Sequence, residues 1–166
     1  MIKDKSMKTK ILIINGPNLN MLGIRETSIY PAVTLERMLE ITREFNYCRP
    51  VEIDHFQSNH EGALIDRIQT AGSAYDFFVV NAGALTHYSI ALRDALLAAG
   101  LPFAEVHISN IFAREPFRHK SVLSDIAVTV VSGGGELAYA LGITAGIDHL
   151  AKKNRGAKAS AREKIK

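Results

Sequence analysis

The chain has 166 residues, which suits one domain with a sizeable core. Its composition, 47% apolar and 22% charged, is that of an ordinary globular protein. No apolar run reaches the ~20 residues that a membrane span needs, and the N-terminus lacks the apolar stretch of a signal peptide. The single Cys48 cannot form an internal disulfide or a thiolate cluster for a metal. We therefore expect a reduced, cytoplasmic protein without a membrane partner.

The net charge of +3 is distributed unevenly along the chain. Residues 1–10 contribute +3 and residues 152–166 contribute +6, whereas residues 11–151 carry −6. A positive total usually suggests a polyanionic partner, but here the excess lies at the two ends of the chain. Because a lysine-rich end is typical of a solvated tail, we expect residues 152–166 to be disordered and do not expect nucleic acid as a partner.

The first predicted strand is KILIIN at residues 10–15, an apolar, β-branched run that turn-forming residues follow. An irregular stretch then continues to Val33. Thr34 caps a predicted helix, in which apolar residues recur at helical spacing and which ends before Pro50.

A second strand is predicted at residues 50–56, where apolar and polar residues alternate. Ser58 and Glu61 form the S-x-x-E pattern of a capping box, which predicts a helix that begins there and continues through Ala71. The apolar run DFFVVNA at residues 76–82 predicts the third strand.

Strands and helices continue to alternate in the rest of the chain. The predicted elements are a helix from about Ser89 to Gly100, strands at 102–108 and 127–132, and a last helix that follows the glycines at 133–135 and ends at about Lys152. Five apolar strands that alternate with helices predict an α/β fold. We expect a three-layer, doubly wound, flavodoxin-like domain with a five-stranded parallel sheet of order 2-1-3-4-5.

In such a sheet, ligands bind beyond the carboxyl ends of the strands, near the switch point between the first and third strands. The polar residues expected at this edge are Asn15, Asn18, Asn81, His87, Glu105, His107, Ser109 and Asn110. The long loops after the first and fourth strands add Arg25, Tyr30, Arg114 and Arg118. Loops of this length in a small domain usually cover a binding site.

Glu105 and His107 lie two residues apart on a predicted strand, so their side chains leave the same face. A carboxylate beside an imidazole fixes the tautomer and favours the charged ring, which prepares a histidine to deliver a proton. An ordinary polar strand end is one alternative. A metal site made of Glu105, His107 and His87 is another, although no tight ligand spacing supports it.

Arg25, Arg114 and Arg118 belong to loops that we expect to face one another across the sheet edge. Arginine binds a planar carboxylate through two hydrogen bonds, so three arginines at one edge suggest an anionic ligand, with solvated loop charge as the alternative. Opposite charges nearby lower the pKa of a phenol. If two of the guanidinium groups lie beside Tyr30, a tyrosinate base is therefore accessible near neutral pH.

A nucleotide-binding or nucleic-acid-binding module is the rival function for this fold. The chain lacks both the G-x-G-x-x-G pattern and the P-loop pattern. The glycines at 133–135 precede a predicted helix and can cradle a phosphate, but such a run more often forms a tight turn, which we favour here. The basic residues of 152–166 are the other support for this alternative.

Four segments and Tyr30 together form a specific combination of motifs: INGPNLNMLGIRE at 14–26, FQSNHEG at 56–62, NAGALTHYSIALRDAL at 81–96 and EVHISNIFAREPFR at 105–118. In order and spacing they resemble the type II 3-dehydroquinate dehydratases. The resemblance covers about residues 8–151, which we expect to form a single catalytic α/β domain. Residues 1–7 are then an N-terminal extension and residues 152–166 a basic tail.

The resemblance implies a hydro-lyase that removes water from 3-dehydroquinate to give 3-dehydroshikimate, by anti elimination through an enolate, without a metal or an organic cofactor. The catalytic residues that it implies are Tyr30 as general base, His107 as general acid, Glu105 behind His107, Arg25 and Arg114, which favour the ionised tyrosine, and Asn18, which holds a water against the enolate oxygen. The substrate-binding residues that it implies are Ile108 and Ser109 for the carboxylate, Asn81, His87 and Arg118 for the ring hydroxyls, and Asp94, which reaches the site of a neighbouring subunit.

The resemblance also implies a homododecamer, arranged as a tetramer of trimers, with the small-molecule substrate as the ligand. Both aromatic biosynthesis through the shikimate pathway and quinate breakdown use this reaction, and the sequence leaves both roles open. Lys120 is the only lysine between residues 11 and 151 and lies outside the predicted site, so we do not expect the lysine imine of the unrelated type I enzymes. Pro31 and Tyr88 depart from the family's pattern, and Pro31 predicts a stiffer lid.

Overall fold

A computed structural model describes residues 8–24 and 33–163 of the chain. Its centre is a parallel sheet of five strands in the order β2-β1-β3-β4-β5, as predicted. The strands are β1 (Thr9–Asn15), β2 (Val51–Gln57), β3 (Phe77–Asn81), β4 (Phe103–His107) and β5 (Thr129–Ser132). The order reverses between β1 and β3, which places the switch point of the sheet at Asn15 and Asn81, the last residues of these strands.

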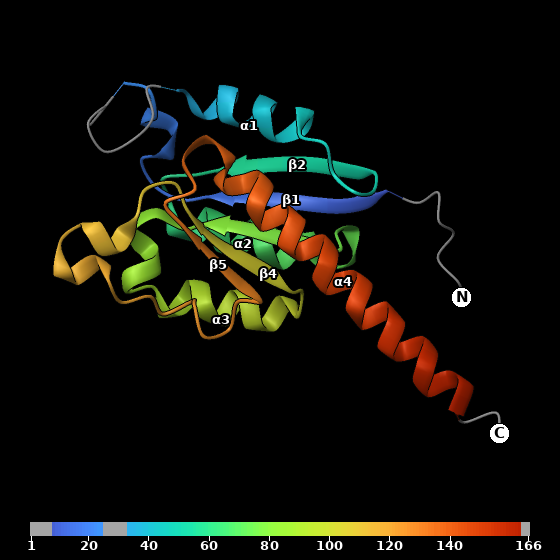
Figure 1. Cartoon of the computed structure of the whole chain (residues 1–166). Helices are drawn as coiled ribbons and strands as arrows, with labels where there is room; N and C mark the ends of the chain where they lie inside the picture. The colour runs from blue at the N-terminus through green and yellow to red at the C-terminus, as the bar shows by residue number, and fades with distance from the viewer. Residues whose placement is uncertain (1–7, 25–32, 164–166) are drawn as a thin grey trace.

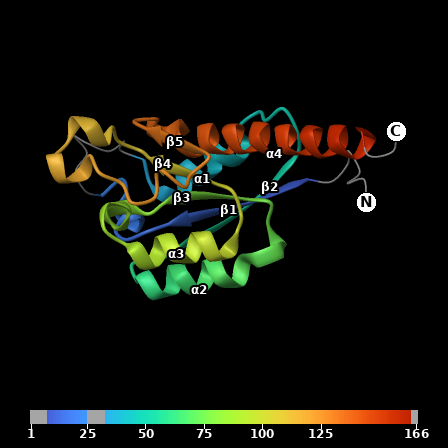
Figure 2. The ribbon, with the colours of Figure 1, turned by 90° about the horizontal axis from the view of Figure 1, so that it is seen from below.

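Helices cover both faces of the sheet, and Figure 2 shows α1 and α4 on one side and α2 and α3 on the other. Their bounds are α1 (Leu35–Glu44), α2 (Glu61–Ala71), α3 (Ile90–Ala99) and α4 (Ala138–Glu163). Side chains of successive strand residues point to opposite faces. Thus Ile11 and Ile13 of β1 pack in the core under α1 and α4, whereas Leu12 and Ile14 pack in the core under α2 and α3. The central strands β1, β3 and β4 are buried on both faces over nearly their whole length, which is why they read as apolar runs, whereas the edge strands β2 and β5 are only partly buried.

Two of the predicted helix starts are confirmed. The Thr34 hydroxyl accepts a hydrogen bond from the Arg37 amide, and the Ser89 hydroxyl accepts one from the Leu92 amide. The expected capping box at Ser58 is wrong, because α2 begins later, with His60 as its N-cap. The Ser58 hydroxyl accepts from the His60 amide.

The last helix is longer than predicted and ends at Glu163 instead of about Lys152. Residues 152–163, which we expected to be disordered, thus continue α4 in the structure. Lysine, arginine, alanine and glutamate favour helix, and Lys152 forms an i,i+4 ion pair with Asp148. Figure 1 shows the end of α4 extending past the sheet, so this part of the helix has no core to cover.

Within the described part of the chain, no helix combines the length and the apolar character needed to cross a membrane.

Candidate active site

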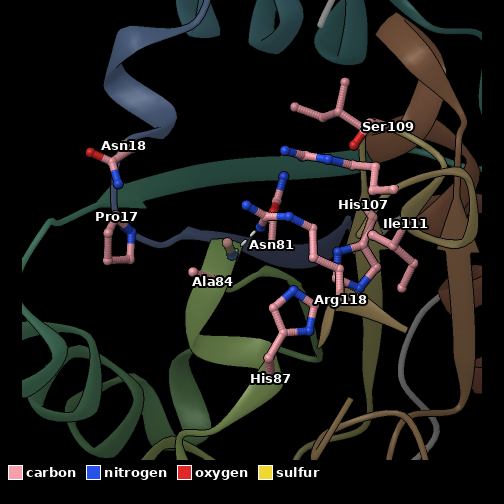
Figure 3. Close-up of a pocket in the computed structure, with 12 residues that line it drawn as sticks. Pro17, Asn18, Asn81, Ala84, His87, His107, Ser109, Ile111 and Arg118 are labelled. Atoms are coloured by element: carbon pink, nitrogen blue, oxygen red, sulfur yellow. Dashed lines mark hydrogen bonds between the residues drawn. The ribbon is translucent and has the colours of Figure 1, made fainter. Parts of the chain in front are cut away.

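A pocket of about 280 Å³ opens at the carboxyl ends of β1, β3 and β4, where the sequence places the polar residues. Twelve of the described residues line it: Pro17, Asn18, Asn81, Gly83, Ala84, His87, His107, Ile108, Ser109, Ile111, Arg114 and Arg118. Figure 3 shows the rings of His87 and His107 and the guanidinium group of Arg118 gathered on one side, with Pro17 and Asn18 opposite them. The charged side chains of the lining are therefore basic, which favours an anionic ligand.

The floor of the pocket at the switch point is a buried chain of hydrogen bonds. Nδ2 of Asn81 donates to the Tyr139 hydroxyl over 3.2 Å, and this hydroxyl donates to Oδ1 of Asn15 over 2.6 Å. Burial raises the pKa of the Tyr139 phenol, so the phenol keeps its proton. Tyr139 projects from α4 and fixes how Asn81 presents its amide to the pocket.

Asn18 follows β1 with φ at 66°, in the left-handed region that asparagine tolerates better than most residues. The backbone amide of Asn18 donates to Oδ1 of Asn59 over 2.8 Å, and Nε2 of Gln57 donates to the same oxygen over 3.1 Å. Gly16, just before this turn, crosses close to β3, because a Cβ there would lie 2.2 Å from the carbonyl oxygen of Ala82. Residues at the ends of β2 and β3 therefore hold the Asn18 turn at the pocket.

Glu105 and His107 at the end of β4 are in contact, as their spacing predicts. Nε2 of His107 donates to Oε1 of Glu105 over 2.9 Å, and Glu105 is fully buried. Burial disfavours the carboxylate, but hydrogen bonds from His107, Ser124, Thr86 and Ser121 outweigh it and lower the pKa of Glu105 to about 2. An ionised carboxylate thus lies behind an imidazole whose other ring nitrogen, Nδ1, is left for the pocket.

The second histidine, His87, lies at the end of the 3₁₀ turn η3 (Gly83–His87). Nδ1 of His87 donates to the Lys120 carbonyl oxygen over 2.8 Å, which leaves Nε2 as the nitrogen available to a ligand. Partial burial lowers the pKa of His87, helped by the nearby His107 and Arg118 and opposed by its hydrogen bond to Lys120. We therefore expect a neutral ring here at neutral pH, suited to hydrogen bonding with hydroxyl groups.

Arg114 and Arg118 follow β4, on either side of Glu115. Nε of Arg118 lies 2.9 Å from Oε2 of Glu115, and Nε of Arg114 lies 3.5 Å from the same oxygen. The Arg114 side chain is 9% exposed. One carboxylate thus positions two guanidinium groups that line the pocket, and the net charge of this trio is positive.

The glycines at 133–135 form a turn, as favoured from the sequence. Gly133 donates its amide to the carbonyl oxygens of His107 and Ser109, and Gly135 donates its amide to that of Ile108. Gly133 has φ at 80°, and a Cβ there would lie 3.1 Å from Cβ of Asn110. These amides bind the end of β4, which explains the glycines without a phosphate.

The structure brings most of the predicted site residues together. Those that line the pocket are Asn18, Asn81, His87, His107, Ile108, Ser109, Arg114 and Arg118, with Glu105 directly behind His107. Asp94 lies on the exposed side of α3, outside the lining. Arg25 and Tyr30 lie outside the described residues. The described residues hold no group of three or more side chains that could ligate a metal. The Glu105 carboxylate instead accepts hydrogen bonds from three hydroxyl groups.

Sequence reasoning missed the residues that orient these groups, namely Thr86, Ser121, Ser124 and Tyr139. The three hydroxyl residues carry no spacing signal, because they come from two separate segments and meet only at Glu105. Tyr139 has a weak signal, since it is a polar-tipped residue on the buried face of a helix that follows the sheet edge.

Comparison with known proteins agrees with this architecture. The sequence model of the family described as dehydroquinase class II matches residues 9–147. A 3-dehydroquinate dehydratase from Thioalkalivibrio sulfidiphilus is 51% identical over 146 residues, covering 87% of this chain and 99% of that protein. A catabolic 3-dehydroquinase from Podospora anserina is 48% identical over 157 residues, covering 87% of this chain and 97% of that protein.

Solved structures are similar over the same region. The type II dehydroquinase from Butyrivibrio crossotus has a TM-score of 0.77 and 45% identity, covering 82% of this chain and 95% of that one. The type II dehydroquinase from Propionibacterium acnes has a TM-score of 0.72 and 39% identity, covering 81% of this chain and 93% of that one. The chain belongs to the class II dehydroquinase family.

Proposed function

We propose that this protein dehydrates 3-dehydroquinate to 3-dehydroshikimate by anti elimination, in the shikimate pathway or in quinate breakdown. The observation that carries the proposal is the Glu105–His107 pair in a pocket whose charged lining is basic. The pair supplies a proton donor for a leaving hydroxyl, and the arginines attract a carboxylate substrate. The relatives named for this reaction support the choice of substrate.

The reaction divides between a base and an acid. Tyr30, as a tyrosinate favoured by Arg25 and Arg114, takes the C2 proton, and the electron pair moves onto the ketone oxygen as an enolate. A water held by Asn18 stabilises that oxygen. The enolate then collapses, the C1–oxygen bond breaks, and His107 gives its proton to the leaving hydroxyl, which departs as water. Base and acid are regenerated by proton exchange with solvent.

The substrate carboxylate is bound by Ile108 and Ser109. In a trans peptide the carbonyl and the following amide point in opposite directions. The carbonyls of His107 and Ile108 accept from Gly133 and Gly135, so the amides of Ile108 and Ser109 point away from the glycine turn. Two adjacent amides and the Ser109 hydroxyl suit the two oxygens of a carboxylate.

The ring hydroxyls are bound by Asn81, His87 and Arg118, which line the pocket. Asp94 lies outside this lining, which fits a role in the site of a neighbouring subunit. That role requires an oligomer, and the expected assembly is a dodecamer of four trimers, whose mass light scattering measures directly. A monomeric active enzyme would remove Asp94 from the site.

The direct test is to mix the purified protein with 3-dehydroquinate and follow the absorbance of the conjugated enone in the ultraviolet. We expect turnover by the wild-type protein and none by Tyr30→Phe, because a phenyl ring cannot accept the proton. A wild-type protein that gives no product, beside an active dehydratase as positive control, would contradict the proposed function. Full activity in Tyr30→Phe would exclude the tyrosine as base.

A further inference from the structure

We propose that Thr86, Ser121 and Ser124 are positioning residues for the acid step, which hold the Glu105 carboxylate ionised and turned toward His107. The inference rests on the proposed dehydratase function, and it concerns the layer of residues behind the pocket. It assigns a role to the segment 120–125, which belongs to no strand or helix.

The contacts of Glu105 use both of its carboxylate oxygens. Oε1 accepts from the hydroxyls of Thr86 and Ser121, the latter over 2.7 Å, in addition to Nε2 of His107. Oε2 accepts from the hydroxyl of Ser124. Glu105 and Thr86 are both fully buried, so these hydroxyls replace the water that would otherwise solvate the charge.

The Ser121 hydroxyl has two acceptors within reach of its proton, Oε1 of Glu105 at 2.7 Å and the Thr86 hydroxyl oxygen at 3.1 Å. Its oxygen accepts from the amides of Leu123 and Ser124, over 2.9 and 3.1 Å, and these bonds use its two lone pairs. The hydrogen of the hydroxyl is therefore left to donate, and Oε1 of Glu105 is both the nearer acceptor and the charged one. The turn at 121–124 thus presets the direction of a donor.

The segment 120–125 is anchored to the η3 turn and to α3. The Val122 amide donates to the Thr86 carbonyl over 2.8 Å, and Leu123 is fully buried. Arg93 of α3 donates to the Val122 carbonyl over 2.7 Å and pairs through both terminal nitrogens with Asp125. Because the Lys120 carbonyl binds His87, one short segment sets the orientation of both histidines of the pocket.

The acid step explains why three donors are needed. Before the step, the charge of Glu105 is compensated by the imidazolium of His107. When Nδ1 of His107 gives its proton to the leaving hydroxyl, the ring becomes neutral and the buried carboxylate loses its counter-charge. Donors that are already in place stabilise the carboxylate at that moment without reorganisation. Without these donors, the Glu105–His107 pair gives up its Nδ1 proton less readily. The carboxylate then also competes more strongly with the ring for the proton between Nε2 and Oε1.

The first test compares Ser124→Ala with Ser124→Thr, because within the described residues the Ser124 hydroxyl hydrogen-bonds to Glu105 alone and the threonine keeps a hydroxyl. We expect kcat to fall ~10-fold in Ser124→Ala, with KM within ~2-fold, since a hydrogen bond to a charged group is lost at the acid step. Ser124→Thr should recover most of kcat. The matched control is Thr144→Ala on α4, which removes a hydroxyl that donates to the Ala140 carbonyl of the same helix and should leave kcat unchanged.

The second readout is the pH dependence of kcat. Loss of a donor destabilises the Glu105–His107 pair most after the pair has lost its proton. The alkaline limb of the kcat–pH profile should therefore move to higher pH by about half a pH unit to one pH unit in Ser124→Ala. Among the described residues, the other charged or titratable groups that line the pocket with His107 are His87, Arg114 and Arg118, and the proposed mechanism adds Tyr30 and Arg25. A His87→Asn background separates any contribution of His87. A residue that acts only through stability would lower the folded fraction and leave the limb in place.

A double-mutant cycle shows whether the hydroxyls act through Glu105. In the Glu105→Gln background, Ser124→Ala should have almost no further effect on kcat, because there is no carboxylate to hold. The same fold loss in both backgrounds would overturn the proposal. Thr86→Val, with Thr86→Ser as its hydroxyl-keeping control, tests the second donor independently and serves if Ser124→Ala does not fold.

A measurement without substrate separates this proposal from the proposed function. The imidazole ¹⁵N shifts of His107, followed against pH in the wild type and in Ser124→Ala, report the pH at which the pair loses its proton. An upward displacement in the variant supports the positioning role, and identical curves overturn it. Absence of turnover in the wild type would contradict the dehydratase function alone and would leave this result standing.

Discussion

Glu105 couples protonation to folding. Its pKa is lowered from 4.5 to about 2 in the folded protein, against the opposing effect of burial, by hydrogen bonds from His107 and three hydroxyls. A carboxyl whose pKa is lower when folded stabilises the protein above its unfolded pKa, and this stabilisation is lost as pH falls through the folded pKa. We expect the free energy of unfolding to fall by roughly 3 kcal/mol from this group between about pH 4.5 and 2.

Urea denaturation at pH 6 and at pH 3 measures the larger part of this loss. Glu105→Gln should be less stable at pH 6 and should show a smaller loss between the two pH values, since the titrating group is gone. An equal loss in the wild type and in Glu105→Gln would assign the acid sensitivity to other carboxyls.

Tyr139 couples α4 to the pocket floor through its hydroxyl. Tyr139→Phe leaves Oδ1 of Asn15 buried without its donor, and among the described residues Nδ2 of Asn15 already has no hydrogen-bond partner. We expect a loss of ~1–3 kcal/mol in stability and a higher KM, because Asn81 is no longer oriented. Tyr47→Phe is the control, since it removes a hydroxyl bonded to the Thr42 carbonyl, away from the pocket. It should cost stability without changing KM in the turnover assay.

At the residue scale, the sequence predicts contacts that follow from local geometry. Glu105 and His107 share a strand face, and a spacing of two is enough to predict their contact. The bonds from Thr86 and Ser121 to the same carboxylate join segments 19 and 16 residues away, and no local period encodes them. Such contacts depend on how β4 packs against the η3 turn and the segment 120–125, which only the three-dimensional structure defines.

Helix α4 packs closely against the sheet, and two of its glycines permit this approach. A Cβ at Gly146 would lie 2.5 Å from the Phe77 ring, and one at Gly142 would lie 2.9 Å from Val106. We expect Gly146→Ala to destabilise the protein by ~1–3 kcal/mol, because Phe77 is fully buried and cannot move away freely.

Gly62→Ala is the matched control for this prediction. Gly62 lies in the first turn of α2, where an added Cβ meets nothing within 4 Å. Alanine favours helix over glycine, so this variant should be as stable as the wild type or more stable by up to about 1 kcal/mol. Thermal unfolding of the two variants side by side decides the matter, and a stabilised Gly146→Ala would show that α4 can shift outward.

At the element scale, the buried strands were predictable because parallel strands covered on both faces are apolar throughout. The cap of α2 was not, because Ser58 and Glu61 have the right spacing but Ser58 binds the His60 amide, and Glu61 contacts Ser89 instead. The end of α4 was also missed. Its last turns leave the sheet, so no apolar period marks where the helix stops.

For the whole molecule, the division of charge leads to a test of the basic end. We expect removal of residues 152–166 to leave turnover nearly unchanged, because the end of α4 extends past the sheet (Figure 1), whereas the pocket lies at the carboxyl ends of β1, β3 and β4. The Lys152–Asp148 pair that is lost has both side chains more than half exposed and contributes little. Kinetic assay of the truncated protein measures this directly.

The same truncation tests the rival function. A nucleic-acid-binding module would bind nucleic acid in a salt-dependent manner and would lose that binding with residues 152–166. Titration of labelled DNA and RNA at two salt concentrations, with full-length and truncated protein, gives the answer. Salt-dependent binding by the full-length chain alone would add a polyanion to its partners.

The start of β1 and the last turns of α4 lie at the amino-terminal edge of the parallel sheet (Figure 1). The residues that line the pocket lie at the opposite edge, where the strands end. This arrangement has a practical use. A fluorescent label, a fusion partner or a solid support joined through the end of α4 is held a full strand length from the mouth of the pocket. A subunit tethered in this way leaves the route of its small substrate open.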